Sequence, residues 1–234
     1  MEKILEFLVD KTIVRGKLFV PKGKGPFPGV IFFHGSGGIG EMHFDNAKKL
    51  SERGIITLAI NYRGVGLSEG EFLEQTIQDG IEDGEKALEL FLSLPEVDKT
   101  RVGICGGSFG GFVAALLCNR FPIKSLLLEA PASYSPEVLK TTQRDSDPEI
   151  KRDNFLTSIS YNEIEKYKGV LLLVKNELDD VLPEDMVEEY DRRAVNASSK
   201  ELFILKGAQH RISINPKALG IYKNKLIEFF TNTL

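Results

Sequence analysis

The segment from Arg101 to Gly111, RVGICGGSFGG, contains a serine whose surroundings suit nucleophilic chemistry. Residues Val102–Cys105 have the pattern of a short buried strand, and the sequence G-x-S-x-G follows, centred on Ser108. An apolar helical pattern begins immediately afterwards. A strand, a sharp turn and a helix in this order would hold the Ser108 hydroxyl exposed at the apex of a strained turn. The backbone N–H of Phe109, where the helix starts, can then face a developing oxyanion.

This short motif has a competing interpretation, a glycine-rich loop whose serine only caps the helix. A serine hydroxyl is a poor nucleophile at neutral pH unless a base accepts its proton and a carboxylate orients that base. A catalytic reading of Ser108 therefore requires a histidine and an acid elsewhere in the chain.

Three histidines limit the search for the base. His34 directly follows an apolar run, His43 opens a predicted helix, and His210 lies in the segment GAQHRI, between the last predicted strand and helix. Catalytic groups gather beyond the carboxyl ends of parallel strands, where both His34 and His210 are expected. The glycines after His34 suit a loop that donates backbone N–H groups, so we expect His34 to support that loop. His210, in a loop freed by the preceding glycine, is the favoured base, with an ordinary exposed loop histidine as the alternative.

Acidic residues follow the predicted strand Val170–Val174 and lie between Ser108 and His210 in the chain. They are Glu177, Asp179 and Asp180. The order serine, acid, histidine is the one that accompanies a G-x-S-x-G turn. An acidic loop residue is usually solvated surface, but this order, the position after a strand and the nearby Pro183 favour a catalytic role for one of the three.

The hydrophobic pattern predicts a frame for these residues. Strands are expected at Lys3–Val9, Thr12–Val20, Gly29–Phe33, Ile55–Ile60, Val102–Cys105, Lys124–Leu128, Val170–Val174 and Glu201–Leu205. Helices are expected at Phe44–Arg53, Ile77–Leu94, directly after Ser108, Glu184–Ala194 and Pro216–Phe230. This alternation predicts an α/β fold with a mostly parallel sheet covered by helices on both faces. The first two strands are expected to form an antiparallel hairpin at one edge.

Residues 133–168 interrupt the alternation with a polar, charged segment that contains scattered apolar side chains. We expect a short helical cap insertion there, within a single domain over residues 1–234. A substrate pocket is expected beside it, lined by Tyr134, Phe155, Leu156 and Ile159. Simple packing of these four side chains on the rim of the sheet is the alternative.

The composition, 42% hydrophobic and 27% charged with a net charge of −4, is typical of a globular protein without a basic face for nucleic acid. No stretch is long enough to span a membrane, and the N-terminal segment lacks the features of a secretory signal. Two cysteines, Cys105 and Cys118, are too few for a disulfide framework. We therefore expect a cytoplasmic protein that binds neither nucleic acid nor a membrane.

Five features of the chain together resemble the α/β-hydrolase superfamily. They are His34-Gly35 after a strand, the loop Asn61–Ser68 (NYRGVGLS), the turn around Ser108, the segment Asp179–Pro183 (DDVLP) and His210. The pattern is most similar to single-domain bacterial esterases of the feruloyl-esterase, cinnamoyl-esterase and dienelactone-hydrolase-like type. It also resembles the catalytic domain of prolyl oligopeptidases. The resemblance covers nearly the whole chain.

The resemblance implies roles for the matching residues. In such families the acid stands four residues before the proline of a D-x-x-[VI]-P segment, which identifies Asp179. Glu129 is a rival, because some lipases of this fold place their acid after that strand. The residue after the first His-Gly, here Ser36, supplies a second oxyanion N–H beside that of Phe109. Asn61 departs from the family pattern, in which aspartate or another residue opens the arginine loop.

Ser108 stands where dienelactone hydrolases have cysteine and where dehalogenases and epoxide hydrolases have aspartate, which argues against those chemistries. The sequence therefore predicts a serine esterase in which His210 activates Ser108 and Asp179 orients His210. No cofactor or metal is required, and the expected partner is a small ester of a small to medium acyl or aromatic acid. A thioesterase, an oligopeptide hydrolase and a non-catalytic binding protein are the alternatives. Homodimer formation through a sheet edge or the insertion is left open.

Overall fold

The computed structural model describes residues 1–145 and 155–234, and its strands and helices follow the predicted alternation. The strands of its sheet are β1 (Glu2–Val9), β2 (Thr12–Phe19), β3 (Phe27–Phe33), β4 (Ile56–Asn61), β5 (Val97–Gly107), β6 (Ile123–Glu129), β7 (Val170–Asn176) and β8 (Ser199–Leu205). Within the described residues they form one eight-stranded sheet in the order β1-β2-β4-β3-β5-β6-β7-β8. The pairs from β4 to β8 in that order are parallel, and β2 pairs antiparallel with both β1 and β4. The predicted edge hairpin is confirmed.

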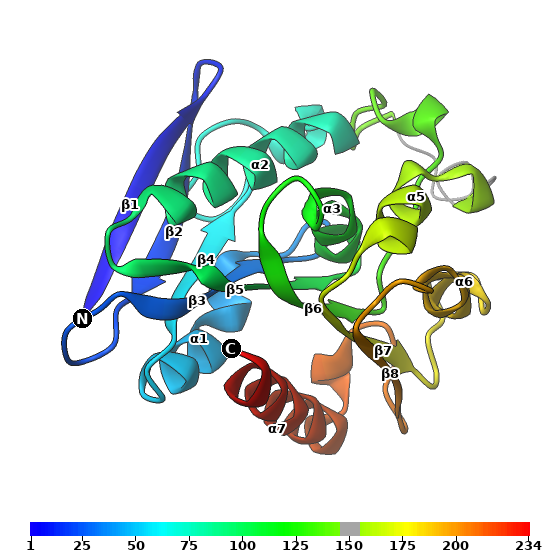
Figure 1. Ribbon diagram of the computed structural model, residues 1–234. Helices are drawn as coiled ribbons and strands as arrows, with labels where there is room; N and C mark the ends of the chain where they lie inside the picture. Colours follow the sequence, from blue (N-terminus) through cyan, green and yellow to red (C-terminus); the bar gives the residue numbers. More distant parts are fainter. Residues whose placement is uncertain (146–154) are drawn as a thin grey trace.

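Helices cover both faces of this sheet (Figure 1). They are α1 (Phe44–Ser51), α2 (Ile77–Ser93), α3 (Phe109–Leu117), α5 (Ile159–Lys166), α6 (Met186–Arg193) and α7 (Pro216–Thr233). Helices α2, α3, α5 and α6 lie on one face, and α1 and α7 lie on the other. The predicted α/β architecture is confirmed.

The buried strands contribute to a separate apolar layer on each face of the sheet. In β5, Ile104 belongs to the layer under α2 and α3, and its neighbour Cys105 belongs to the layer under α1 and α7. Successive side chains of a strand point to opposite faces, so a strand covered on both sides must be apolar throughout. This requirement explains why the central strands appear in the sequence as continuous apolar runs.

The predicted cap, residues 133–168, contains two kinds of structure. Short 3₁₀ turns lie at Pro136–Val138 and Phe155–Thr157, and the part at 146–154 lies outside the described residues. Helix α5 packs against α3 and α6 and buries Tyr161 and Ile164 in the core. Because parallel strands need a crossover between them, α5 is the crossover helix from β6 to β7.

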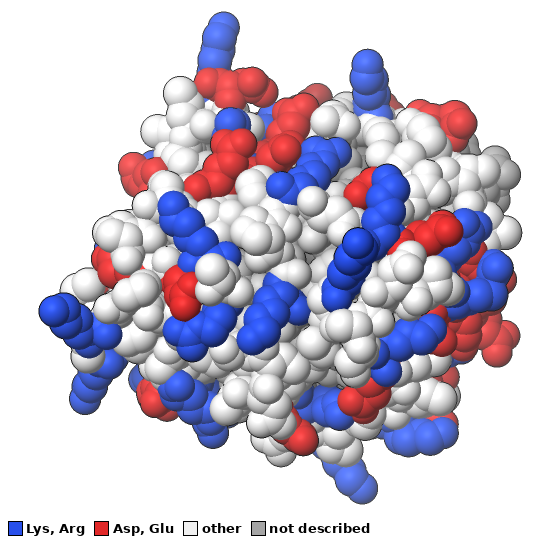
Figure 2. Space-filling model, in the orientation of Figure 1, with Lys and Arg blue, Asp and Glu red and all other residues white. Residues whose placement is uncertain are grey.

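Figure 2 shows Lys and Arg spread over one face of the molecule with Asp and Glu between them, in agreement with the interspersed charges of the sequence. In residues 1–145 and 155–234, no helix combines the length and apolar character that crossing a lipid bilayer demands.

Candidate active site

Ser108 lies between β5 and α3, at the apex of a turn with a strained backbone. Its φ of 51° and ψ of −118° lie in a region that residues with a side chain rarely adopt. A Cβ added to Gly106 would lie 2.3 Å from the carbonyl oxygen of Gly110, and one added to Gly110 would lie 2.1 Å from that of Phe33. Both glycines are required by space, because the start of α3 lies directly against the ends of β5 and β3.

Gly110→Ala is expected to destabilise the fold by about 3 kcal/mol, because overpacking here meets main-chain atoms of Phe33 and His34 that cannot move aside like a flexible side chain. Urea unfolding of the variant measures the loss. Gly220→Ala is the matched control, since it adds the same methyl group in α7 with nothing within 4 Å. Helix propensity there should raise stability by up to about 1 kcal/mol. Equal stability of the two variants would contradict the crowding argument.

The side chains of Ser108, His210 and Asp179 come from the ends of three different strands and form one chain of hydrogen bonds. The Nε2 of His210 lies 3.0 Å from the Ser108 Oγ, and its Nδ1 lies 2.8 Å from the Asp179 Oδ2. The Asp179 Oδ1 accepts hydrogen bonds from the backbone N–H groups of Val181 and Leu182 at 2.9 and 3.0 Å. When Nδ1–H donates to Asp179, Nε2 is left to accept a proton, which is the tautomer that a general base needs.

The charges around these three hydrogen-bonded side chains favour the imidazolium form of His210. Burial opposes protonation of His210, but the hydrogen bond to Asp179 and the negative charges of Asp179, Glu129 and Asp180 outweigh it and raise the pKa. Burial would also raise the pKa of Asp179, but hydrogen bonds from His210 and two backbone N–H groups hold that pKa below its usual value. The arrangement can accept a proton from Ser108 and stabilise the cation that forms.

The loop after β3 passes directly beside Ser108. A Cβ added to Gly35 would lie 3.4 Å from the Ser108 Cβ, and Ser36 follows as the next residue. The other predicted donor, Phe109, is the first residue of α3, and N–H groups of a first helical turn have no carbonyl partner in their own helix. The loop and the start of α3 therefore both lie next to Ser108, where the predicted oxyanion site would need them.

His34 supports this loop from within the core. Its Nε2 accepts the N–H of Tyr62 at 3.3 Å, and its Nδ1 lies 2.7 Å from the carbonyl oxygen of Gly35. Burial lowers the pKa of His34 to about 4, so the ring is neutral near pH 7 and Nδ1–H donates to Gly35. The structure thus places His34 where it holds the backbone beside Ser108, as expected.

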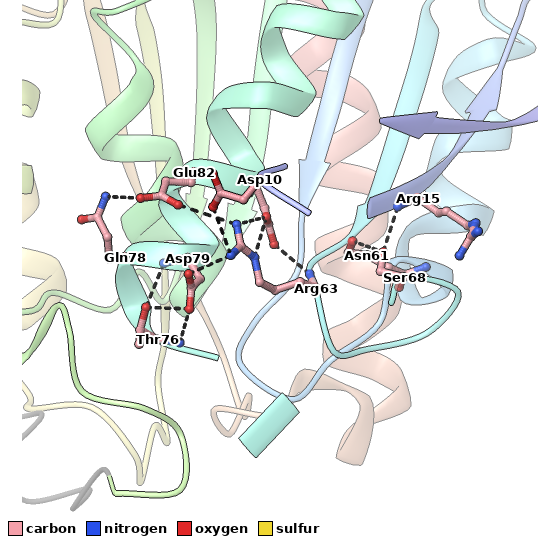
Figure 3. A network of polar contacts seen from close by, with 10 residues as sticks. Asp10, Arg15, Asn61, Arg63, Ser68, Thr76, Gln78, Asp79 and Glu82 are labelled. Atoms are coloured by element: carbon pink, nitrogen blue, oxygen red, sulfur yellow. Dashed lines mark hydrogen bonds and ion pairs between the residues drawn. The ribbon is translucent and has the colours of Figure 1, made fainter. Parts of the chain in front are cut away.

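Arg63 anchors the segment that contains Tyr62 (Figure 3). Its backbone N–H and its Nε donate to the carboxylate of Asp83 in α2 at 2.7 and 2.9 Å, and its Nη1 lies 2.8 Å from Asp79. Asp83 is fully buried, so water screens this ion pair weakly. Because the adjacent Tyr62 donates to His34, the Arg63 network fixes the position of the loop beside Ser108.

Asn61, the residue that departs from the family pattern, also holds two loops together. Its Oδ1 accepts the backbone N–H of Gly40 at 2.6 Å, and its carbonyl oxygen accepts the hydroxyl of Ser68 at 2.6 Å. An asparagine here thus closes the arginine loop on the segment that follows β3.

The four predicted pocket residues fall into two groups. Tyr134 is buried with its ring centre 4.9 Å from that of Phe112, and Phe155 packs against the same core. Leu156 and Ile159 are 52% and 36% exposed. Tyr134 and Phe155 therefore lie where packing alone would put them, whereas Leu156 and Ile159 present apolar surface to solvent.

A contact that the sequence patterns do not indicate lies next to this site. Asn176, at the end of β7, donates from Nδ2 to the Glu129 Oε1 at 2.6 Å and also lies 3.5 Å from the carbonyl oxygen of His210. Glu129, the rival acid, thus bonds Asn176, while Asp179 accepts from the His210 ring. In the sequence, Asn176 is only a polar residue after an apolar run.

In the part of the chain that the structure describes, no three His, Cys, Asp or Glu side chains are grouped so that they could hold a metal ion.

Comparison with known proteins relates the chain to enzymes. A sequence profile of the prolyl oligopeptidase family matches residues 42–234. The chain is 27% identical to acyl-coenzyme A amino acid N-acyltransferase 2 of Rattus norvegicus over 228 residues, which is 85% of this chain and 52% of that protein. It is 30% identical to esterase EstD of Thermotoga maritima over 136 residues, which is 55% of this chain and 32% of that protein. The chain thus spans about half, or less, of the length of these curated relatives.

Among solved structures, that of ferulic acid bound to Est1E from Butyrivibrio proteoclasticus is similar to this one along almost its whole length. The TM-score is 0.79 at 21% sequence identity, and the match covers 98% of each chain. The two proteins share the α/β-hydrolase fold.

Proposed function

This chain belongs to the prolyl oligopeptidase family of serine hydrolases, and from the geometry of its site we propose that it is a serine esterase. The observation that carries the proposal is the chain of hydrogen bonds from Ser108 through His210 to Asp179. A nucleophile, a base and an orienting acid that are hydrogen-bonded in this order make a serine hydroxyl reactive near neutral pH. The proposed substrates are carboxylic esters of small to medium acyl or aromatic acids.

In the proposed reaction, the Nε2 of His210 accepts the proton of Ser108 while Oγ attacks the ester carbonyl carbon. The carbonyl oxygen becomes an oxyanion, which accepts hydrogen bonds from the backbone N–H groups of Ser36 and Phe109. Asp179 holds the ring and stabilises the imidazolium. The alcohol then leaves with the proton from His210, and water activated by the same ring hydrolyses the acyl-enzyme.

Two observations support an apolar acyl or aromatic group in the substrate. Exposed apolar side chains lie in the segments that follow the strands leading to the site: Ile39 and Met42 after β3, Leu178 and Val181 after β7, and Ile214 after β8. Apolar surface of this kind suits contact with an apolar ligand. The relative EstD is an esterase, and Est1E binds ferulic acid. Leu156 and Ile159, also exposed, are the proposed contacts from the insertion.

An acyl-coenzyme A thioester is the second candidate substrate, because the relative from Rattus norvegicus is an acyl-coenzyme A amino acid N-acyltransferase. A thioester carbonyl would form the same acyl-enzyme on Ser108 and differ only in its leaving group. The distinction between the two candidates therefore lies in substrate binding rather than in the triad.

A substrate panel tests the proposed function. We expect the highest kcat/KM on p-nitrophenyl esters of short or medium acyl length or on methyl ferulate, lower values on acyl-coenzyme A thioesters, and none on short peptides. A fluorophosphonate probe, which labels reactive serines, should label the protein. A higher kcat/KM on thioesters would favour the second candidate. Absence of both turnover and labelling would contradict an enzymatic role.

We also propose a cytoplasmic location for a single-domain protein whose partner is its small-molecule substrate. The support is that Cys105 and Cys118 are buried free thiols, as a reducing compartment allows.

A further inference from the structure

A largely buried carboxyl group lies beside the site without a role in the proposed reaction. Glu129 is the last residue of β6 and pairs with Gly107 of β5, where an added Cβ would lie 2.8 Å from the Glu129 Oε2. The carbonyl oxygen of Glu129 accepts the backbone N–H of Ser108 at 2.9 Å. Glu129 is therefore in direct contact with the turn that presents the nucleophile.

Asn176 links the Glu129 carboxyl to the loop that holds His210. Asn176 is buried, with 1% of the residue exposed. Its Nδ2 lies 2.6 Å from the Glu129 Oε1 and 3.5 Å from the His210 carbonyl oxygen. Its own carbonyl oxygen accepts the N–H of Asp179 at 3.3 Å. Asn176 thus connects the carboxyl to the main chain of His210 through its side-chain amide, and to the main chain of Asp179 through its own carbonyl group.

The titratable groups around Glu129 come from four other parts of the fold. They are His210 after β8, Asp179 after β7, Cys105 in β5 and Tyr222 in α7. Burial raises the pKa of Cys105 to about 12 and that of Tyr222 well above its usual value, so both are neutral near pH 7. Asp179 is negative. Within this set, His210 is the group that can become cationic and compensate a charge on Glu129.

Glu129 itself changes charge close to neutral pH. Burial raises the pKa of its carboxyl to about 7, against the hydrogen bond from Asn176 and the attraction of His210. It is a neutral acid below that pH and a carboxylate above it. As a carboxylate it favours protonation of His210, which is the change that deprotonation of Ser108 requires.

Building on the proposed function, we propose that Glu129 and Asn176 form a positioning pair that holds the His210 loop and gives the developing imidazolium a second negative charge. Asp179 holds the ring of His210 by a hydrogen bond. In the positioning pair, Asn176 contacts the main chain of His210, and the negative charge of Glu129 attracts the imidazolium. The activity of the enzyme then depends on two coupled ionisations, those of His210 and Glu129.

Glu129→Gln tests the pair, because glutamine keeps an acceptor oxygen for Asn176 and removes the negative charge. At a pH well above 7, we expect kcat to fall about tenfold with little change in KM. A tenfold fall corresponds to the loss of one pK unit of interaction between the Glu129 carboxylate and the imidazolium of His210. Since loss of the carboxylate lowers the pKa of His210, the acid limb of kcat/KM should move to lower pH. A purely structural role would leave that limb in place. Glu184→Gln, the same change at an exposed residue after β7, is the control and should alter neither value.

A histidine titration by NMR tests the pair without an activity assay. Burial lowers the pKa of His34 to about 4 and that of His43 to about 3, so of the three histidines only His210 should titrate near neutral pH. Its pKa should be lower in Glu129→Gln than in the wild type or Glu184→Gln. An unchanged titration overturns the pair even in an active esterase. If the pKa of His210 is lowered in Glu129→Gln but the wild-type protein does not turn over esters, the positioning pair is supported and the proposed function is overturned instead.

Discussion

Ser108→Ala is expected to reduce kcat on a p-nitrophenyl ester about 10⁵-fold or more, which is the scale seen when a serine hydrolase loses its nucleophile. The Ser108 Oγ is the atom that must bond to the acyl carbon, and it lies 3.0 Å from the nitrogen that accepts its proton. Alanine deletes this one atom and adds no bulk to the crowded turn. The fold, and with it KM, should therefore change little. Steady-state kinetics measure kcat and KM of the variant, and thermal unfolding measured in parallel shows whether its fold is retained.

The control for this variant is Ser93→Ala, which removes an exposed hydroxyl at the end of α2. It should retain wild-type kcat and wild-type labelling by a fluorophosphonate probe. Labelling that persists in Ser108→Ala would show that another side chain is the nucleophile and would overturn the assignment.

Asp179→Asn is expected to lower kcat about 10⁴-fold with little change in stability. In the wild type, the backbone N–H groups of Val181 and Leu182 donate to one oxygen of Asp179, and the Nδ1 of His210 bonds the other. Those two N–H groups would hold the amide oxygen of an asparagine, so its NH₂ group would face His210. The ring would then carry its proton on Nε2 and could not accept the proton of Ser108. The kcat and the pH profile of the variant measure this effect.

Two further variants identify the acid by comparison. Asp180→Asn removes the same charge from the neighbouring exposed residue, where water screens it, and should have a small effect. Glu129→Gln should have the intermediate, tenfold effect argued above. If either of these collapsed kcat while Asp179→Asn remained active, the acid would be misassigned.

The sequence alone determined the fold class and a short set of residues that could form the active site. The central strands are apolar along their whole length because both faces of the sheet are covered, and this makes them visible as runs such as Val170–Val174. Polar residues that follow such runs must gather at one edge of a parallel sheet. This rule left a short set of candidates, and the resemblance to the α/β-hydrolases was needed to choose Asp179 among the three acids after Val170–Val174. The structure brings Ser108, His210 and Asp179 within hydrogen-bond distance, although Ser108 and His210 lie 102 residues apart in the chain and His210 and Asp179 lie 31 residues apart.

Local sequence placed the strand ends less well. The strand predicted at Val102–Cys105 extends over Val97–Gly107. At its C-terminal end, Gly106 pairs with β3 and β6 and Gly107 pairs with β6, and these glycines continue the ladder without any side-chain signal. In the same way, α5 appears in the sequence as part of an insertion and is a crossover helix in the structure, because its apolar residues find partners on α3 and α6.

Only the tertiary structure decided which polar groups share the buried space around the triad. Glu129 and Asn176 lie 47 residues apart in the chain, and nothing in either local pattern relates them. Their contact follows from the parallel pairing of β6 with β7, which brings the ends of the two strands together. Burial then changes the proton affinity of Glu129, and burial is a property of the packed chain rather than of any segment.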